Sequence, residues 1–222
     1  MKTEFAALFS RRLALGAAGA AFAVLAAFGL QAPARAQGAT VSAESLMAPG
    51  ALPDVWEGSK DAPITIVEYA SMTCSHCAAF HQSTYPVLKS KYIDTGKVRF
   101  TLREFPLDPL AAAAFMLARC AGDDKRDAVI DLLFAQQKNW AFVDQPATKL
   151  EAVLKQTGMG REAFEACLNN QKLLDDVQKV RDQASKEFGV SATPTFFING
   201  KKQSGEVSPE TLDKLLEPLL KG

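Results

Sequence analysis

The spacing of apolar and polar residues divides the first half of the chain into a strand, a helix and a second strand. Residues 64–69 form a dense apolar run, which is typical of a strand covered on both faces. Helical spacing follows over residues 78–92, where Pro86 is expected to kink the helix. Residues 98–103 alternate like a strand, so the pattern predicts an α/β unit with a right-handed crossover.

A long helical block follows, and the strand period returns only near the C-terminus. Helical periodicity predicts five helices, over residues 109–120, 125–138, 148–156, 160–169 and 172–188. Residues 195–198 then predict a strand, Asn199-Gly200 a hairpin turn, and residues 201–204 a polar edge strand. The last helix is expected to begin at Ser208-Pro209, because serine suits the N-cap and proline the first helical position.

Residues 1–36 have the pattern of an export signal. Their beginning carries three basic residues, Lys2, Arg11 and Arg12. An uncharged apolar run over residues 13–30 precedes Ala34-Arg35-Ala36, which fits a cleavage site that leaves Gln37 as the new N-terminus. The pattern leaves open a general secretory or a twin-arginine signal, and a retained anchor is the alternative to cleavage.

Composition and charge narrow the classes of function. A chain of 222 residues with 48% hydrophobic residues has room for one domain with an insertion and a substantial core. Without residues 1–36 its net charge would be −3, and nothing in the sequence favours nucleic acid binding. Residues 37–60 show weak periodicity and are interpreted as an N-terminal arm or linker, with a short strand near residues 54–57.

The candidate chemistry lies in Cys74-Ser75-His76-Cys77, between the first strand and the first helix. This position places Cys74 at the exposed mouth of a helix N-terminus, with Cys77 one turn further in and more buried. Unpaired backbone N–H groups and the helix dipole favour a thiolate there, and His76 would favour it further. The motif predicts a redox-active pair of cysteines.

Other uses of the two cysteines are less well supported by the sequence. A structural disulfide would close too small a loop to restrain the unfolded chain much. Zinc would need further ligands, and covalent haem a histidine where Ala78 stands, so no metal or organic cofactor is expected. A module that binds Cu(I) through Cys74, Cys77 and a histidine is the alternative from another class. His81 is expected to be structural or to face solvent.

Three further residues are assigned roles. Glu68 shares a strand face with the first apolar residues, so it is expected to be partly buried and to relay a proton to or from Cys77. The alternative is an exposed carboxylate paired with Arg103. Cys120 and Cys167 remain after the redox pair, and export with an even cysteine count favours one structural disulfide over two buried thiols.

Residues 55–221 resemble the DsbA-like thiol:disulfide oxidoreductases of the bacterial periplasm. The resemblance rests on Glu68, the Cys74–Cys77 motif and Val190-Ser191-Ala192-Thr193-Pro194-Thr195. It implies a thioredoxin-like fold whose halves are residues 61–106 and 189–222, with residues 107–188 as an inserted helical subdomain. It also implies a cis Thr193–Pro194 bond that faces the cysteines and presents the backbone to an extended substrate segment.

The resemblance implies a monomeric periplasmic enzyme that introduces disulfides into unfolded or reduced exported proteins. A quinone-linked membrane partner would reoxidise it. Ser75 stands where the best-known oxidases have proline, and Thr193 also occurs in isomerase-type relatives, so an isomerase or reductase of the same fold remains the alternative. Those isomerases usually add an N-terminal dimerisation domain, for which residues 37–60 are too short.

Overall fold

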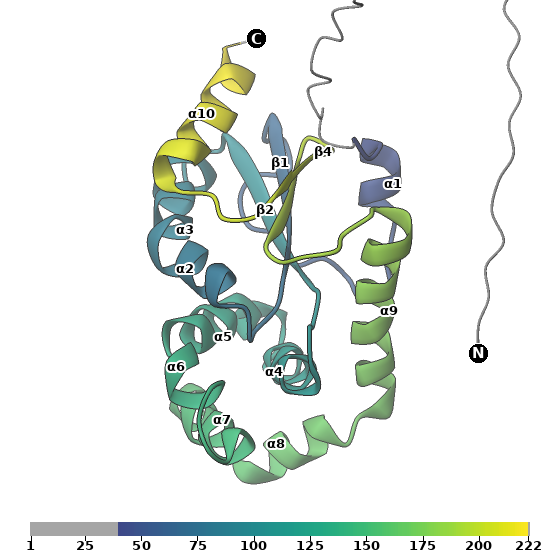
Figure 1. Ribbon diagram of the computed structural model, residues 1–222, viewed down its shortest axis with the longest axis vertical. Helices are drawn as coiled ribbons and strands as arrows, with labels where there is room; N and C mark the ends of the chain where they lie inside the picture. The colour runs from purple at the N-terminus through teal and green to yellow at the C-terminus, as the bar shows by residue number, and fades with distance from the viewer. Residues whose placement is uncertain (1–39, 222) are drawn as a thin grey trace, which may run out of the picture. The chain divides into compact units, whose positions relative to one another are not determined.

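A four-stranded mixed sheet lies at the centre of the structure, a computed structural model that describes residues 40–221 (Figure 1). The strands are β1 (Ile64–Ala70), β2 (Val98–Glu104), β3 (Thr195–Ile198) and β4 (Lys201–Ser204). Their order is β2-β1-β3-β4, with β1 parallel to β2 and the other neighbouring pairs antiparallel. The four strands predicted over residues 64–69, 98–103, 195–198 and 201–204 are present, whereas the short strand predicted near residues 54–57 is only an isolated bridge at Glu57. The predicted export signal lies outside the described residues.

The side chains of β1 alternate between two hydrophobic clusters, one on each face of the sheet. Ile64 and Ile66 pack with the cluster that contains helices α2, α3 and α10, whereas Val67 and Tyr69 pack with the cluster that contains α1 and α9. The bounds are α1 (Ala43–Met47), α2 (Ser75–Ser83), α3 (Tyr85–Leu88), α9 (Gln171–Glu187) and α10 (Pro209–Leu220). Figure 1 shows these two groups on opposite sides of the sheet. Because Glu68 has the same parity as Ile66, it faces α2.

The helix predicted over residues 78–92 begins earlier and is interrupted. It starts at Ser75, and α2 ends at Ser83, with Thr84 between it and α3. Pro86 has no N–H to donate to the preceding turn, so it is best accommodated at the beginning of a helix, where α3 places it. A π-helical turn, Lys89–Ile93, completes the segment.

Between β2 and β3 lies the predicted helical insertion. It contains α4 (Pro109–Cys120), α5 (Asp123–Ala135), α6 (Gln137–Trp140), α7 (Pro146–Leu154), a 3₁₀ turn (Lys155–Thr157) and α8 (Arg161–Leu168), before α9. In Figure 1, α4 to α8 gather at one end of the sheet and α9 runs back beside it. The pattern did not predict α6 as a separate helix, because its buried Gln137 and Trp140 follow α5 without a turn signal.

A buried ionic cluster joins the insertion to the sheet. Arg126 of α5 is fully buried, and its Nη2 donates to the Leu102 carbonyl at 2.7 Å and to Glu104 Oε1 at 3.0 Å. Arg119 of α4 pairs with the same Glu104 oxygen at 2.7 Å. Burial alone would raise the pKa of Glu104, but the two guanidinium groups lower it. Removing either arginine would therefore weaken the compensation of a buried carboxylate.

The described part of the predicted arm, residues 40–60, packs against the domain. Ser42 caps α1, whose Leu46 is buried, and Glu57 forms an isolated bridge with Phe100 of β2. The short strand predicted near residues 54–57 is therefore reduced to this single bridge. The pattern did not predict α1, because five residues are too few to reveal a helical period. Among the described residues, none of the helices has the length and apolar character needed to cross a membrane.

A disulfide joins Cys120 at the end of α4 to Cys167 in α8, over a sequence separation of 47. It connects two helices of the insertion.

Replacing both Cys120 and Cys167 by alanine should lower the free energy of unfolding by about 4 kcal/mol, because the bridge constrains a long loop in the unfolded chain. Urea denaturation measures this with Cys74 and Cys77 kept reduced. The matched control, alanine at Cys74 and Cys77 instead, should lose much less. A loss below about 1 kcal/mol would contradict the structural role of the bridge.

Candidate active site

The sulfur of Cys74 caps the N-terminus of α2. Cys74 has extended backbone angles, and its Sγ accepts a hydrogen bond from the backbone N–H of Cys77 at 3.2 Å. Both cysteines are free thiols in the structure; Cys74 is 8% exposed and Cys77 0%. The helix N-terminus therefore directs its N–H groups and the positive end of its dipole at one sulfur only.

The loop before β3 covers Cys74. The Thr193–Pro194 peptide bond is cis, as the resemblance implied. In its thiol form Cys74 donates through Sγ to the Thr193 carbonyl, at 3.4 Å. Cys74 is consequently less exposed than its position at a helix mouth predicts, because this loop lies over the sulfur. The three residues Cys74, Thr193 and Pro194, distant in sequence, meet at one place in the fold.

The pKa values of the two thiols move in opposite directions. The pKa of Cys74 is lowered to about 6, and the largest cause is a hydrogen bond from the side chain of Cys77. Burial opposes this shift, whereas the side chain of Thr193 and the backbone N–H groups of Cys77 and His76 add to it. Burial raises the pKa of Cys77 well above its ordinary value, and the charge of nearby Glu68 raises it further. At neutral pH the pair is therefore a thiolate beside a thiol.

The insertion holds the loop that carries Cys74. The buried amide of Gln137 in α6 donates to the carbonyls of Met72 and Cys74, at 2.8 and 3.0 Å. Asp108, the N-cap of α4, accepts a hydrogen bond from the Thr73 hydroxyl and one from the Ala111 N–H at 2.8 Å. Sequence reasoning missed Gln137 and Asp108, because a lone amide or carboxylate in a helical block carries no motif.

Glu68 lies behind the cysteines and is fully buried, so the alternative of an exposed strand-end carboxylate is wrong. Arg103 pairs instead with Asp54, at 2.7 Å. The Oε2 of Glu68 lies 3.0 Å from His81 Nε2, and its buried Oε1 has no hydrogen-bond partner among residues 40–221. His81 is itself buried and belongs to this site, so it does not face solvent. Its position four residues after Cys77, on the same helix face, was the available signal.

His76 points away from the sulfurs toward the loop before α10. Its side chain is 66% exposed, and its Nδ1 lies 3.3 Å from Oε2 of Glu206. The part of His76 that lowers the pKa of Cys74 in this structure is its backbone N–H. A role for the imidazole stays a prediction. The exposed Glu206 is a partner that the motif did not indicate.

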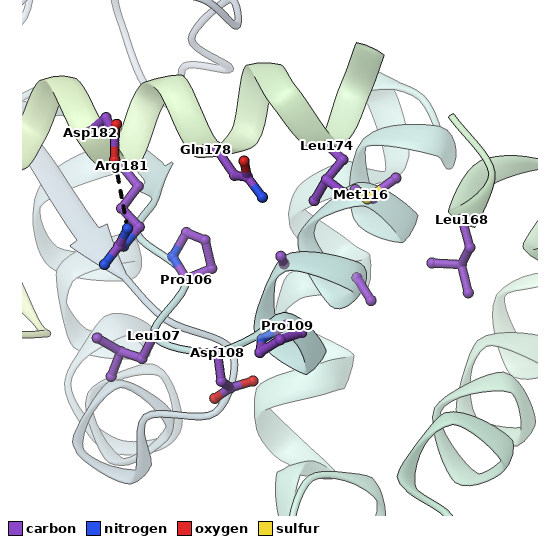
Figure 2. Close-up of a pocket in the computed structure, with 12 residues that line it drawn as sticks. Pro106, Leu107, Asp108, Pro109, Met116, Leu168, Leu174, Gln178, Arg181 and Asp182 are labelled. Atoms are coloured by element: carbon purple, nitrogen blue, oxygen red, sulfur yellow. Dashed lines mark ion pairs between the residues drawn. The ribbon is translucent and has the colours of Figure 1, made fainter. Parts of the chain in front are cut away.

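A cavity of about 650 Å³ opens beside the loop that holds Cys74. Figure 2 shows Leu107, Asp108 and Pro109 on one side of it and α9 residues Leu174, Gln178 and Arg181 on the other. Leu107 is 53% exposed, although it is apolar. Because Asp108 also binds Thr73, one wall of the cavity is attached to the residue before Cys74.

Within residues 40–221, no group of three or more histidine, cysteine, aspartate or glutamate side chains is arranged to hold a metal ion. The chemistry that the arrangement offers is that of the dithiol, with one activated sulfur and one protonated sulfur.

Residues 51–218 match the family model described as thioredoxin, so fold and site define a thioredoxin-like protein. The crystal structure of alpha-DsbA1 from Wolbachia pipientis has a TM-score of 0.74 and 30% identity, and the match covers 81% of this chain and 96% of that one. The chain belongs to the DsbA-like thiol:disulfide oxidoreductase family. The predicted thioredoxin-like fold with a helical insertion is thereby confirmed.

Two other proteins extend the comparison. A protein-disulfide oxidoreductase of Rickettsia conorii, whose name gives that activity as provisional, is 36% identical over 169 residues, or 74% of this chain and 61% of that protein. The matched part thus spans less than two thirds of that relative. BdbD from Bacillus subtilis shares the fold, with a TM-score of 0.65 and 22% identity over 83% of this chain and 98% of that one.

Titration of the reduced protein by thiolate absorbance should show a midpoint at about pH 6 for Cys74, with no second thiolate until far higher pH. Cys77→Ala should move the midpoint upward, because it removes the largest cause of the low pKa. The Cys74→Ser variant is the control and should lose the low-pH transition. A wild-type midpoint near that of free cysteine, about 8.5, would refute the arrangement.

Proposed function

We propose that this protein introduces disulfides into unfolded or reduced exported proteins in the periplasm, by exchange with the Cys74–Cys77 pair. The observation that carries the proposal is the placement of the two cysteines on one helix turn. The sulfur of Cys74 accepts the Cys77 N–H at the helix N-terminus, whereas Cys77 is fully buried, so their pKa values shift in opposite directions. The predicted export signal, which lies outside the described residues, and the family of the chain support the location.

The proposed reaction has two exchange steps. A substrate thiolate attacks Sγ of Cys74 in the oxidised enzyme, the bond to Cys77 breaks, and Cys77 leaves as a thiolate that takes up a proton. A second substrate thiolate then attacks the substrate sulfur of the mixed disulfide, and Cys74 leaves as a stable thiolate. The substrate gains one disulfide, and the enzyme is left as a dithiol that has gained two electrons.

Three residues would assist these steps. Glu68, buried near Cys77, would supply the proton that Cys77 takes up and accept it in the reverse direction. The backbone of Thr193 and Pro194 would pair with an extended substrate segment, in the manner of an added β-strand. The cavity beside Leu107, whose wall residue Asp108 binds Thr73, would offer apolar surface to substrate side chains.

The low pKa of Cys74 favours the oxidising direction. Only the reduced enzyme carries the thiolate, so whatever stabilises the thiolate stabilises the reduced form and makes the disulfide easier to give away. This is the established explanation for DsbA, and we carry it over to this chain. A quinone-linked membrane partner would restore the disulfide, and the enzyme would act as a monomer without a metal or organic cofactor.

Cys74→Ser should abolish disulfide exchange, because the activated thiolate is lost. Cys77→Ser should instead accumulate mixed disulfides through Cys74, because the thiol that resolves them is missing. Non-reducing electrophoresis with mass spectrometry detects these adducts, and the double variant is the control that should form none. An active Cys74→Ser variant, together with a Cys77→Ser variant that forms no adducts, would refute the mechanism.

The Cys74–Cys77 pair should be clearly more oxidising than the thioredoxin pair, since each unit by which the Cys74 pKa falls is worth about 30 mV. Equilibration with glutathione measures the potential. Because the folded-state pKa is lowered, stabilisation of the reduced form is lost as pH falls through about 6. The potential should therefore change slope with pH near that value.

His76→Ala and Glu206→Gln should be measured by the same glutathione equilibration. His76→Ala should make the pair more reducing, because the imidazole is predicted to favour the Cys74 thiolate, and Glu206→Gln tests whether the partner of His76 contributes to the potential. A thioredoxin-like potential in the wild type, with fast reshuffling of a scrambled substrate, would favour an isomerase or reductase. Copper in the purified protein without exchange activity would favour the metal-binding alternative.

A further inference from the structure

A chain of three titratable side chains runs from the buried site to the surface. It begins at the fully buried Glu68 of β1, passes through His81 of α2 and ends at Asp131 of α5. His81 Nε2 lies 3.0 Å from Glu68 Oε2, and its Nδ1 lies 3.3 Å from Asp131 Oδ1. The His81 side chain is 3% exposed and that of Asp131 is 47% exposed. One end of the chain is thus inaccessible to solvent and the other is in contact with it.

The imidazole of His81 is held in a fixed orientation. Its ring stacks between Tyr85 and Phe134, at centroid distances of 5.0 and 4.5 Å. Stacking on both faces and a carboxylate at each ring nitrogen leave little freedom for the ring to turn. Each nitrogen therefore serves one carboxylate, with Nε2 toward the buried side and Nδ1 toward the exposed side.

The groups around His81 are mostly acidic. Besides Glu68 and Asp131, the neighbouring elements bring Asp127 and Glu57 close enough to influence this region, and each already has a basic or hydroxyl partner. Asp127 pairs with Arg126 at 2.7 Å, and Glu57 accepts from Tyr85 and from Lys89. Burial alone would lower the pKa of His81, but the charge of Glu68 and the contacts with Asp131 raise it to about 9. His81 is therefore a cation between two carboxylates at neutral pH.

We propose that His81 and Asp131 form the path by which the proton of Cys77 exchanges with solvent, so that disulfide exchange is coupled to proton movement through the back of α2. The inference rests on the proposed function and adds to it two positioning residues, which act through Glu68. Neither residue belongs to the Cys-x-x-Cys motif or touches the reacting sulfurs.

Every proton is accounted for in the step that forms the Cys74–Cys77 disulfide. The S–H bond of Cys77 breaks and an O–H bond forms at the unpartnered Oε1 of Glu68, directly or through one water. The N–H bond at His81 Nδ1 breaks, Asp131 receives that proton and passes it to water. One proton reaches solvent, and one remains on each of Glu68 and His81. The freed electron pair of Cys77 attacks Sγ of Cys74 in the mixed disulfide, so the Cys74–Cys77 bond forms while the bond between Cys74 and the partner sulfur breaks and the partner leaves as a thiolate. Opening of the disulfide reverses each transfer.

The two transfers are coupled by charge. When Glu68 accepts a proton it loses the negative charge that holds His81 as a cation, and a buried cation without a counter-charge is unfavourable. Release of the Nδ1 proton to Asp131 restores the balance. The net charge of the three side chains is the same before and after the transfer, so no uncompensated charge is left in the interior.

Two-phase release of thionitrobenzoate from Ellman's reagent tests the proposal. The first phase reports attack by Cys74 and the second reports attack by Cys77 on the mixed disulfide. Asp131→Asn keeps an oxygen that can accept from His81 but cannot take up its proton. It should slow the second phase about tenfold, a part of what general acid–base catalysis usually provides, and leave the first phase within about twofold.

The matched control is Asp123→Asn, which removes the same charge from the same helix, two turns away from Asp131, and should change neither phase. The second phase of Asp131→Asn should also rise more steeply with pH than that of the wild type, because hydroxide replaces the lost path. In a Glu68→Gln background, Asp131→Asn should have little further effect, because residues that act as one unit are not additive.

Three results would overturn the proposal. These are a second phase of Asp131→Asn equal to that of Asp123→Asn, a pH profile unchanged from the wild type, or full additivity with Glu68→Gln. A wild-type protein that shows no two-phase release would instead contradict the proposed function itself, so the two failures are distinguishable. His81→Gln serves as a second variant and should match Asp131→Asn in both phases.

Discussion

The hydrogen bond from the Cys77 N–H to the Cys74 sulfur is the interaction on which the site depends. It makes a cysteine the N-cap of α2, so the first turn of that helix delivers its unpaired N–H groups to a sulfur instead of a hydroxyl or carboxylate. The same turn carries Cys77 into the core, where burial acts in the opposite sense. One local backbone geometry therefore gives two chemically identical side chains opposite pKa shifts, downward for Cys74 and upward for Cys77.

The helical insertion supports that geometry from both sides. The chain enters it through Asp108, which binds Thr73, and leaves it through α9, which leads into the loop of Thr193 and Pro194. Within the insertion, the side-chain amide of Gln137 donates hydrogen bonds to the carbonyls of Met72 and Cys74. The disulfide and the buried pairing of Arg126 with Glu104 secure the insertion itself. The insertion contains neither Cys74 nor Cys77, but it contacts the loop that carries Cys74 and leads into the loop that covers it.

Much of the fold follows from the sequence, and the reasons are local. Strands such as Ile64–Ala70 and helices such as Pro109–Cys120 have apolar periods long enough to be recognised. The short α1 and α6 carry too few residues to show a period, and the break at Thr84 depends on how Pro86 is accommodated. Local pattern thus predicts an element when it is long, and tertiary contacts decide the short ones.

The residues of the site also fall into two groups, those that the sequence indicates and those that only the fold brings together. Cys74, Cys77 and Glu68 were accessible to sequence reasoning because their spacing has a chemical meaning. His81 was not, since a histidine on a helix is equally consistent with solvent, and only the fold brings Asp131 to its other side. Gln137 and Glu206 are likewise defined by contacts between distant segments.

The burial of Cys77 raises the electrostatic cost of ionising its thiol, and the neighbouring side chains affect that cost. A thiol in the core resists ionisation, and a lone buried carboxylate beside it would make ionisation harder still, because two negative charges would share a low-dielectric site. The cationic His81 offsets the charge of Glu68, and Asp131 in turn offsets His81 at the surface. The alternation of acidic and basic side chains from core to solvent lowers the electrostatic cost of burying His81. The low pKa of Cys74 and the raised pKa of Cys77 can then coexist within one turn of helix, because the charges behind them are already balanced.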